Sequence, residues 1–362
     1  MKSKISFFLP SFNIGGVERV FINYANALSD KGYNVDFVVC KAEGVLLDLV
    51  SSSVKVVSLG NIQLRYSFFK LRKYIKKRQP DSVISGGDFP NIMLILAASF
   101  LSKRPQIIIS QHNYYNIEVK NLGLWARCTT FLMKQIYPWS DVVIAVSKGI
   151  MTDLSNKIKL NPKQLLYLPN PIDIDKTMQL GNLPVPSLPN NFIVFIGRLS
   201  KVKNLKLLLN AFQHIKHQGY ELLIVGDGQE RSELEDCANN LERSSKIHFI
   251  GAVPNSMPYL KRAKVLALPS FSEALPTVLL EALAFSIPIV TTPNAGAVEI
   301  LQDAKNAFIS ESFDNVEEFA SLLDSAIVHC AEDDRSLLSK YYTLTSYHNW
   351  NAYYSHDLYL FV

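Results

Sequence analysis

The sequence predicts an α/β protein of two domains, each built on a parallel β-sheet with helices on both faces. Short apolar runs rich in β-branched and aromatic residues alternate with helical stretches almost from one end of the chain to the other, which is the pattern of such sheets. The chain of 362 residues is long enough for two independent cores of about 180 residues each. Its composition is that of an ordinary globular protein, with 48% apolar and 19% charged residues.

The expected strands form two sets. In the first half of the chain they are residues 5–9, 35–40, 54–57, 82–85, 106–110, 142–146 and 165–168. In the second half they are residues 192–196, 221–225, 247–250, 265–268 and 289–291. Between the sets, residues 168–173 and 181–191 are too rich in proline and asparagine for regular structure. We therefore expect domains at 1–180 and 181–340, followed by a C-terminal segment at 341–362.

The composition also bears on location. The longest apolar stretch, 92–101, is about half of what a membrane-spanning helix needs. The first residues faintly resemble a signal peptide, but Pro10 interrupts their short apolar core, so we expect the first strand there. The cysteines show no metal-ligand spacing, and we expect buried free thiols in a reducing cytoplasm. They are Cys40, Cys128, Cys237 and Cys330.

The net charge of +5 is unevenly distributed. Residues 1–180 hold 23 Lys plus Arg against 12 Asp plus Glu, or +11, whereas residues 181–362 hold 14 against 20, or −6. In residues 68–78 basic and apolar positions recur at helical spacing, as in segments that lie on anionic membrane surfaces. An amphipathic helix packed on its own sheet, with a solvated basic face, explains the pattern equally well. We do not expect nucleic acid as a partner, because no recognition motif accompanies the basic residues.

The most informative segment follows the apolar run at 265–268. There a loop turns into a helix, and Pro276 suits the first helical position with Thr277 next to it, so unpaired N–H groups and a positive dipole end suit a phosphate. Glu273 precedes this anion site and Glu281 lies about one turn, roughly 6 Å, beyond it. Carboxylates repel phosphate but bind hydroxyls. The layout therefore fits the ribose, diphosphate and sugar of a nucleotide sugar.

This segment resembles the Glu-x7-Glu signature of retaining glycosyltransferases of family 4. Four further motifs occur in that family's order and approximate spacing, and the resemblance covers most of the chain. They lie at residues 15–19, 197–204, 225–228 and 251–254. The family's pattern usually has glycines where this chain has Ala274 and Ser286. The resemblance implies two Rossmann-like domains facing a cleft, the GT-B architecture, with a C-terminal helix that crosses back to the first domain. Ligands of open parallel sheets bind beyond the carboxyl ends of the strands, so the cleft would hold the active site.

The resemblance also implies roles for single residues. Arg198 and Lys203 would hold the donor diphosphate and stabilise the charge that grows on it as the leaving group. Glu273 would hold hydroxyls of the donor sugar, and His112 would stabilise the oxocarbenium-like transition state. The remaining expected donor contacts are Gly15, Gly16, Val253, Leu275, Pro276, Thr277 and Glu281.

Structural readings of several of these residues stay open beside the functional ones. A lone histidine such as His112 is usually structural, and a Gly15-Gly16 pair after a strand also suits a tight turn. A turn residue is the favoured interpretation of Asp227 in the 225–228 motif.

No metal or other cofactor is expected. Asp173 and Asp175 match the Asp-x-Asp pattern with which glycosyltransferases of another architecture hold a divalent metal. They lie between the domains instead of after a strand inside a nucleotide domain. The basic pair Arg198 and Lys203 would make a metal unnecessary.

The sequence therefore predicts a retaining, metal-independent hexosyltransferase. It would transfer a hexose or N-acetylhexosamine from a nucleotide diphosphate, UDP being favoured, to a glycan in polysaccharide, lipopolysaccharide, capsule or oligosaccharide assembly. The basic first half favours a lipid-linked acceptor and an anionic membrane surface as partners, with the enzyme cytoplasmic and peripheral on the inner face. Two alternatives stay open: a nucleotide-sugar epimerase or phosphorylase on the same fold, and a catalytically silent, membrane-associated nucleotide or glycan binder.

Overall fold

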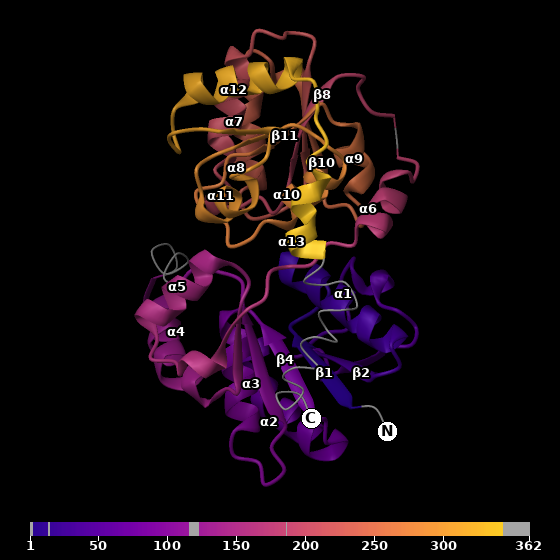
Figure 1. Ribbon diagram of the computed structural model, residues 1–362, viewed down its shortest axis with the longest axis vertical. Coiled ribbons are helices and arrows are strands. Elements are labelled where there is room, and N and C mark those ends of the chain that lie inside the picture. Colours follow the sequence, from indigo (N-terminus) through magenta and orange to yellow (C-terminus); the bar gives the residue numbers. More distant parts are fainter. Residues whose placement is uncertain (1–2, 14, 116–122, 186, 343–362) are drawn as a thin grey trace. The chain divides into compact units, whose positions relative to one another are not determined.

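The protein is described by a computed structural model that covers residues 3–13, 15–115, 123–185 and 187–342. The chain divides into two compact units, the first reaching Asn170 and the second beginning at Pro171. In Figure 1 the first unit runs from indigo to magenta and the second from rose to yellow.

The first unit is built on a seven-stranded sheet with the order β3-β2-β1-β4-β5-β6-β7, and every strand pair in it is parallel. Its strands are β1 Lys4–Leu9, β2 Asn34–Val39, β3 Lys55–Ser58, β4 Ser82–Gly86, β5 Gln106–Gln111, β6 Val142–Ala145 and β7 Leu165–Tyr167. The order reverses between β1 and β4. A reversal of this kind leaves a crevice at the carboxyl ends of the two strands, where open α/β sheets bind ligands.

The helices of the first unit cover both faces of this sheet. They are α1 Gly16–Asp30, α2 Ser67–Arg78, α3 Asp88–Ala98, α4 Gly123–Ile136 and α5 Lys148–Lys157, and the short turn η4 Tyr137–Trp139 follows α4. The buried positions Val20, Phe21, Tyr24 and Leu28 of α1 recur at helical spacing and join the core with Phe7 of β1. On the other face α2 packs on α3, and α3 packs on α4 (Figure 1).

The second unit has a six-stranded parallel sheet with the order β10-β9-β8-β11-β12-β13. Its strands are β8 Phe192–Ile196, β9 Glu221–Val225, β10 Ile247–Gly251, β11 Val265–Leu268, β12 Ile289–Thr291 and β13 Ala307–Ile309. Its helices are α6 Ile174–Gly181, α7 Leu205–His214, α8 Arg231–Asn239, α9 Met257–Arg262, α10 Thr277–Ala284, α11 Ala295–Leu301, α12 Val316–Val328 and α13 Ser339–Tyr342. Figure 1 shows α7, α8 and α12 on one side of the sheet and α6 and α9 on the other. The expected pair of Rossmann-like sheets is confirmed.

The structure differs from the sequence-based expectation in several details. Every expected strand is present, but the edge strand β13 was missed, because its three half-buried residues carry no strong β pattern. The second unit begins at Pro171 instead of 181, because α6 packs on α9 and the Leu180 carbonyl accepts a hydrogen bond of 3.0 Å from Asn255 Nδ2. Of the expected C-terminal segment, residues 343–362 lie outside the described part of the chain.

The expectation of four buried thiols is wrong for three cysteines. Only Cys40 is buried, and its burial raises the pKa of the thiol to about 11. Cys237 is half-buried, whereas Cys128 and Cys330 are exposed, and all four are free. Within the described residues, none of the helices combines the length and the apolar character that crossing a bilayer requires.

Helix α2 is fastened to the sheet by a buried carboxylate. Asp36 of β2 is fully buried and accepts two hydrogen bonds of 3.0 Å from the Arg78 guanidinium and one of 2.6 Å from the Tyr74 hydroxyl. The Tyr74 hydroxyl lies 2.9 Å from Ser6 Oγ of β1. Burial and the neighbouring carboxylate raise the pKa of Tyr74 far above its usual value, so the phenol stays protonated and keeps donating. The C-terminal turn of α2 is thereby fixed against β1 and β2.

We predict that Arg78→Ala lowers the free energy of unfolding by about 3 kcal/mol, because it leaves the buried Asp36 carboxylate without its cation. Lys77→Ala, at the exposed neighbouring position, should change it by less than about 0.5 kcal/mol. Urea denaturation of both variants measures the difference. Equal losses in the two variants would show that the Asp36 ion pair does not stabilise the fold.

Candidate active site

The site residues expected in the second unit all follow the carboxyl ends of strands. Arg198 and Lys203 come after β8, and Glu273 comes after β11. These two strands are neighbours at the point where the strand order reverses, so their loops rise from the same place on the sheet edge. Val253 follows β10, two strands from β8 and therefore about 10 Å away along the edge.

The structure brings Lys203 and Glu273 into direct contact. Lys203 Nζ donates to Glu273 Oε1 at 2.6 Å, with side-chain exposures of 20% and 11%. The same Oε1 accepts a second hydrogen bond of 2.6 Å from Ser270 Oγ. A Cβ built on Gly197 would lie 3.8 Å from Cε of Lys203, so the lysine stem passes over the end of β8. Two residues that were expected to hold different parts of a donor therefore form one half-buried ion pair.

Backbone contacts hold the two loops of this pair together. The Phe271 N–H donates to the Val202 carbonyl at 2.8 Å, joining the β11 loop to the β8 loop one residue away from Lys203. The fully buried Ser270 is braced from the next strand, since Thr292 Oγ1 donates to its carbonyl oxygen at 2.5 Å. Ser270 thus connects the end of β12 to the Glu273 carboxylate.

Helix α11 supports the Glu273 loop from its other side. The Gly296 N–H donates to the Glu273 carbonyl at 3.2 Å, and a Cβ on Gly296 would lie 2.5 Å from that oxygen and 2.7 Å from the Ala274 carbonyl oxygen. No residue other than glycine fits without moving the loop. Asn294, the N-cap of α11, accepts from the Ala297 N–H at 2.9 Å.

Sequence reasoning missed Ser270 and Gly296. A serine three positions before an expected ligand carboxylate was a usable signal, because that spacing permits a local hydrogen bond. Nothing in the sequence around Gly296 shows that it faces residues 273–274, since that approach depends on how α11 packs.

The expected anion-binding turn is present, one residue from its predicted place. Helix α10 begins at Thr277, and Pro276 is its N-cap with an extended backbone, instead of the first helical residue. In the part of the chain that the structure describes, no side-chain hydrogen bond caps the helix at Pro276 and its first turn holds no acidic residue, so the positive end of the helix dipole is suited to an anion. Leu275 and Pro276 are buried, and Glu281 is half-buried on the following turn. This geometry suits a phosphate group.

The loops after β8 and β9 pack backbone against backbone. A Cβ on Gly226 would lie 1.9 Å from the Gly197 carbonyl oxygen, and one on Gly228 would lie 2.2 Å from the Leu199 carbonyl oxygen. The Leu199 N–H donates to the Asp227 carbonyl at 3.0 Å. The exposed Arg198 is therefore held between two anchored neighbours. Asp227 Oδ1 accepts from the Gly228 N–H at 2.7 Å, which agrees with its interpretation as a turn residue.

Gly15 and Gly16 lie in the first unit, at the start of α1 after β1. Gly15 is the N-cap, with an extended backbone at φ −168° and ψ 156°. A Cβ added to Gly16 would meet no atom within 4 Å. The packing of the described residues therefore does not require glycine at position 16.

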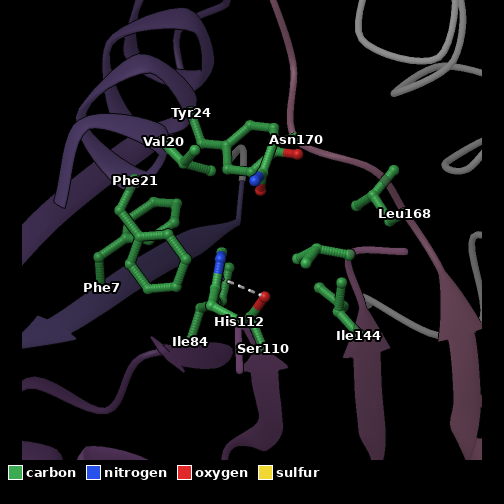
Figure 2. A pocket seen from close by; sticks show the side chains of 11 residues that line it. Phe7, Val20, Phe21, Tyr24, Ile84, Ser110, His112, Ile144, Leu168 and Asn170 are labelled. Atoms are coloured by element: carbon green, nitrogen blue, oxygen red, sulfur yellow. Dashed lines mark hydrogen bonds between the residues drawn. The ribbon is translucent and has the colours of Figure 1, made fainter. Parts of the chain in front are cut away.

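His112 also lies in the first unit, directly after β5. Its Nε2 shares a hydrogen bond of 2.9 Å with Ser110 Oγ, and its ring lies 6.1 Å from that of Phe21. Figure 2 shows the imidazole beside a cavity of about 20 Å³, room for one water, with Tyr24 and Ile144 among the apolar lining residues. Burial lowers the pKa of His112 from 6.5 to about 4. The imidazole is neutral at pH 7 and can act there as a hydrogen-bonding group, not as a fixed cation.

The Asp-x-Asp match has a structural explanation. Asp173 is the N-cap of α6, and its Oδ1 accepts from the Lys176 N–H at 2.9 Å. Asp175 lies in the first turn of the same helix, where its charge complements the helix dipole. Among the described residues, no three His, Cys, Asp or Glu side chains gather as metal ligands would.

We predict a pH-dependent stability that originates at His112. The unfolded chain binds this proton below pH 6.5 and the folded chain only below about pH 4, so the free energy of unfolding should rise with pH between these values. His112→Gln should remove about 2 kcal/mol of the stability difference between pH 7 and pH 4.5. Urea denaturation at the two pH values measures it. An unchanged pH dependence in the variant would contradict the burial of a neutral imidazole.

Comparison with known proteins places these features in a family. Residues 14–176 match the family described as "Glycosyltransferase Family 4", and residues 185–338 match "Glycosyl transferases group 1". The chain is 33% identical over 319 residues to a Campylobacter jejuni protein, "GalNAc-alpha-(1->4)-GalNAc-alpha-(1->3)-diNAcBac-PP-undecaprenol alpha-1,4-N-acetyl-D-galactosaminyltransferase", covering 83% of this chain and 82% of that one. An "Uncharacterized glycosyltransferase" of Haemophilus influenzae is 28% identical over 340 residues, 90% of each chain.

A solved structure has the same fold. HepE of Anabaena, crystallised in complex with UDP and glucose, aligns with a TM-score of 0.79 at 18% identity, covering 98% of this chain and 100% of that one. With two parallel α/β sheets, matches to both family descriptions and a 33% identical relative, the chain belongs to the family 4 type of GT-B glycosyltransferases.

Proposed function

We propose that this glycosyltransferase transfers a hexose or N-acetylhexosamine from UDP to a lipid-linked glycan, with retention of the anomeric configuration and without a metal. The observation that carries the donor assignment is the Lys203–Glu273 ion pair at the carboxyl ends of β8 and β11. It sets a phosphate-binding cation beside a hydroxyl-binding carboxylate. Glycosyl transfer from a nucleotide sugar breaks the bond between the sugar, which carries hydroxyls, and a phosphate. A cation and a carboxylate that lie side by side can hold the groups on the two sides of that bond.

The ion pair need not separate when a donor binds. An ammonium group has three N–H donors, and Lys203 uses one of them on Glu273. A carboxylate can accept about four hydrogen bonds, and the contacts from Lys203 and Ser270 both go to Oε1. Oε2 can therefore accept from sugar hydroxyls while the remaining ammonium protons reach phosphate oxygens. Each partner orients the other toward its part of the donor.

Further groups on the same sheet edge suit the rest of the donor. Arg198 and the start of α10 add positive charge for the diphosphate, and Glu281, on the next turn of α10, is proposed to take the ribose hydroxyls. Backbone groups near Val253 are proposed to contact the base. In the first unit, the packing around position 16 would accept a larger side chain than that of Gly16. We propose that glycine is needed there because it lets a ligand approach the backbone closely.

The proposed chemistry is same-face substitution. The bond between the anomeric carbon and the leaving phosphate oxygen breaks as the acceptor oxygen bonds to that carbon, and the acceptor proton passes to the leaving phosphate oxygen. No carboxylate acts as a nucleophile. Lys203, Arg198 and the α10 dipole would stabilise the growing phosphate charge, the role that a metal has in other glycosyltransferases. Neutral His112 would donate a hydrogen bond near the reacting sugar.

The names of relatives support the acceptor and donor classes. The Campylobacter jejuni relative is named for a sugar acceptor joined to undecaprenol through a diphosphate, and the HepE crystals contain UDP and glucose. A lipid-linked acceptor would place the enzyme at the inner face of a membrane, in contact with anionic lipid, with its catalytic units in the cytoplasm. Product analysis separates transfer from the alternatives: an epimerase or phosphorylase would give an isomerised or phosphorylated sugar, and a silent binder would give none.

We predict that Glu273→Ala and Lys203→Ala each lower kcat/KM for transfer by about 100-fold or more, because each removes a group that contacts the donor in the transition state. Asp227→Asn and Lys206→Ala are matched controls, a turn carboxylate on the same edge and a surface lysine paired with Glu233, and should stay within about threefold of wild type. Circular dichroism checks folding. Near-wild-type turnover in either folded site variant would contradict the assignment.

We predict that Ser270→Ala separates binding of the sugar from binding of the nucleotide. The hydroxyl positions Glu273 Oε1, and Glu273 is proposed to hold the sugar, so the variant should bind UDP-sugar about tenfold more weakly. Binding of UDP should weaken by less than about threefold, because Lys203 keeps its own hydrogen bond to Glu273. Ser270→Thr, which keeps the hydroxyl, should recover most of the affinity for UDP-sugar that Ser270→Ala loses. Calorimetric titration with both ligands measures it. Parallel weakening of both would mean that Ser270 supports the loop in general and does not orient the carboxylate.

A further inference from the structure

One side of α2 presents four lysines to solvent. Lys70, Lys73, Lys76 and Lys77 are exposed, and steps of three, three and one residues place them within about a third of the helix circumference. Phe69, 79% exposed, falls in the same arc. In the described part of the chain, no carboxylate pairs with any of these four ammonium groups. Their charge is therefore available to a partner.

The two arginines of α2 have a different role. Arg78 forms an ion pair with the buried Asp36. Arg72 donates hydrogen bonds to the Ala97 carbonyl at 3.0 Å and to the Phe100 carbonyl at 2.9 Å. They fasten α2 to the sheet and to the end of α3. The helix cannot roll its lysines toward the protein without breaking these contacts, so the basic side is held outward.

Two more exposed aromatic residues adjoin this side of α2. Phe100, 70% exposed, follows α3 at the carbonyl that Arg72 binds, and its ring packs edge-on against Trp139 of η4 at 5.7 Å. Trp139 is itself 44% exposed, and its carbonyl accepts from Arg104 at 2.8 Å. A shallow hollow lined by Phe69, Arg72, Lys73, Lys76 and Lys77 lies along α2. We call the exposed set the docking face: Phe69, Lys70, Lys73, Lys76, Lys77, Phe100 and Trp139.

We propose that the docking face binds an anionic lipid bilayer, an inference that rests on the proposed lipid-linked acceptor. Exposed lysines attract acidic head groups, and aromatic rings at their rim suit the boundary between head groups and acyl chains. Nucleic acid would also neutralise the lysines, and unpaired bases stack on exposed aromatic rings. The proposed lipid-linked acceptor lies in a membrane, and it therefore favours a membrane surface over nucleic acid as the partner of these cations and rings.

The test is flotation of the full-length protein with vesicles of phosphatidylcholine alone and with 30% phosphatidylglycerol. One variant changes Lys70, Lys73, Lys76 and Lys77 to Gln, leaving Arg72 and Arg78 intact. A second changes Phe69, Phe100 and Trp139 to Ser. A matched control changes four exposed lysines elsewhere, Lys55, Lys159, Lys163 and Lys176, to Gln.

We expect wild type to float with the anionic vesicles only. The docking-face lysine variant should lose about 600-fold in partitioning, since each of its four lysines contributes about fivefold, and the control should stay within about threefold. The aromatic variant should lose about tenfold and be released at lower salt. The proposal is overturned if wild type does not float, if the two lysine variants lose binding equally, or if the aromatic variant binds as wild type does, which would indicate a purely electrostatic site for any polyanion.

Activity distinguishes failure of this proposal from failure of the proposed function. With a water-soluble, short-chain acceptor, the docking-face lysine variant should transfer sugar as wild type does, within about twofold, because none of its changes touches the donor site. Transfer without flotation would refute the membrane face and leave the transferase assignment standing. Flotation without transfer by wild type would do the opposite.

Discussion

The contact on which the proposed chemistry depends is the 2.6 Å hydrogen-bonded ion pair between Lys203 and Glu273. Half-buried ion pairs of this kind add little to stability, because the cost of removing the charges from water offsets their attraction. Its value lies in orientation. Ser270 and Lys203 together fix one carboxylate oxygen, and the fixed carboxylate in turn aims the ammonium group, so the groups that would hold sugar and phosphate are positioned before a donor arrives.

This preorganisation depends on close backbone packing at one edge of the second sheet. Gly226 and Gly228 let the loop after β9 touch the loop after β8, and Gly296 lets α11 touch the Glu273 loop. A side chain at any of these glycines would push apart loops that carry Arg198 or Glu273. The same edge contains the start of α10, where the helix dipole adds to the positive charge for a diphosphate. Loop positions and electrostatics are therefore set by the same contacts.

In the first unit, ion pairs and hydrogen bonds fix the orientation of α2 and so decide which of its basic residues face solvent. Arg78 and Tyr74 of α2 bind the buried Asp36 carboxylate. Arg72 of the same helix donates a hydrogen bond to α3. Two of the basic residues on α2 are thus used for the fold, and four remain on the solvent side. The lysines and arginines of α2 are charged, whereas the imidazole of His112 is neutral near pH 7 because its apolar surroundings disfavour the charged form.

The sequence by itself determined the two parallel sheets, the strands other than β13, the helix start near Pro276 and the candidates Arg198, Lys203, Glu273 and Glu281. These follow from apolar periodicity and local motifs, which neighbouring residues decide. Only the tertiary structure decided that Lys203 and Glu273 touch, that Ser270 and Gly296 support them, that α6 belongs to the second unit and that Phe100 and Trp139 adjoin the lysines of α2. These contacts join residues far apart in the chain, and the strand order and helix packing that create them leave no local signal in the sequence.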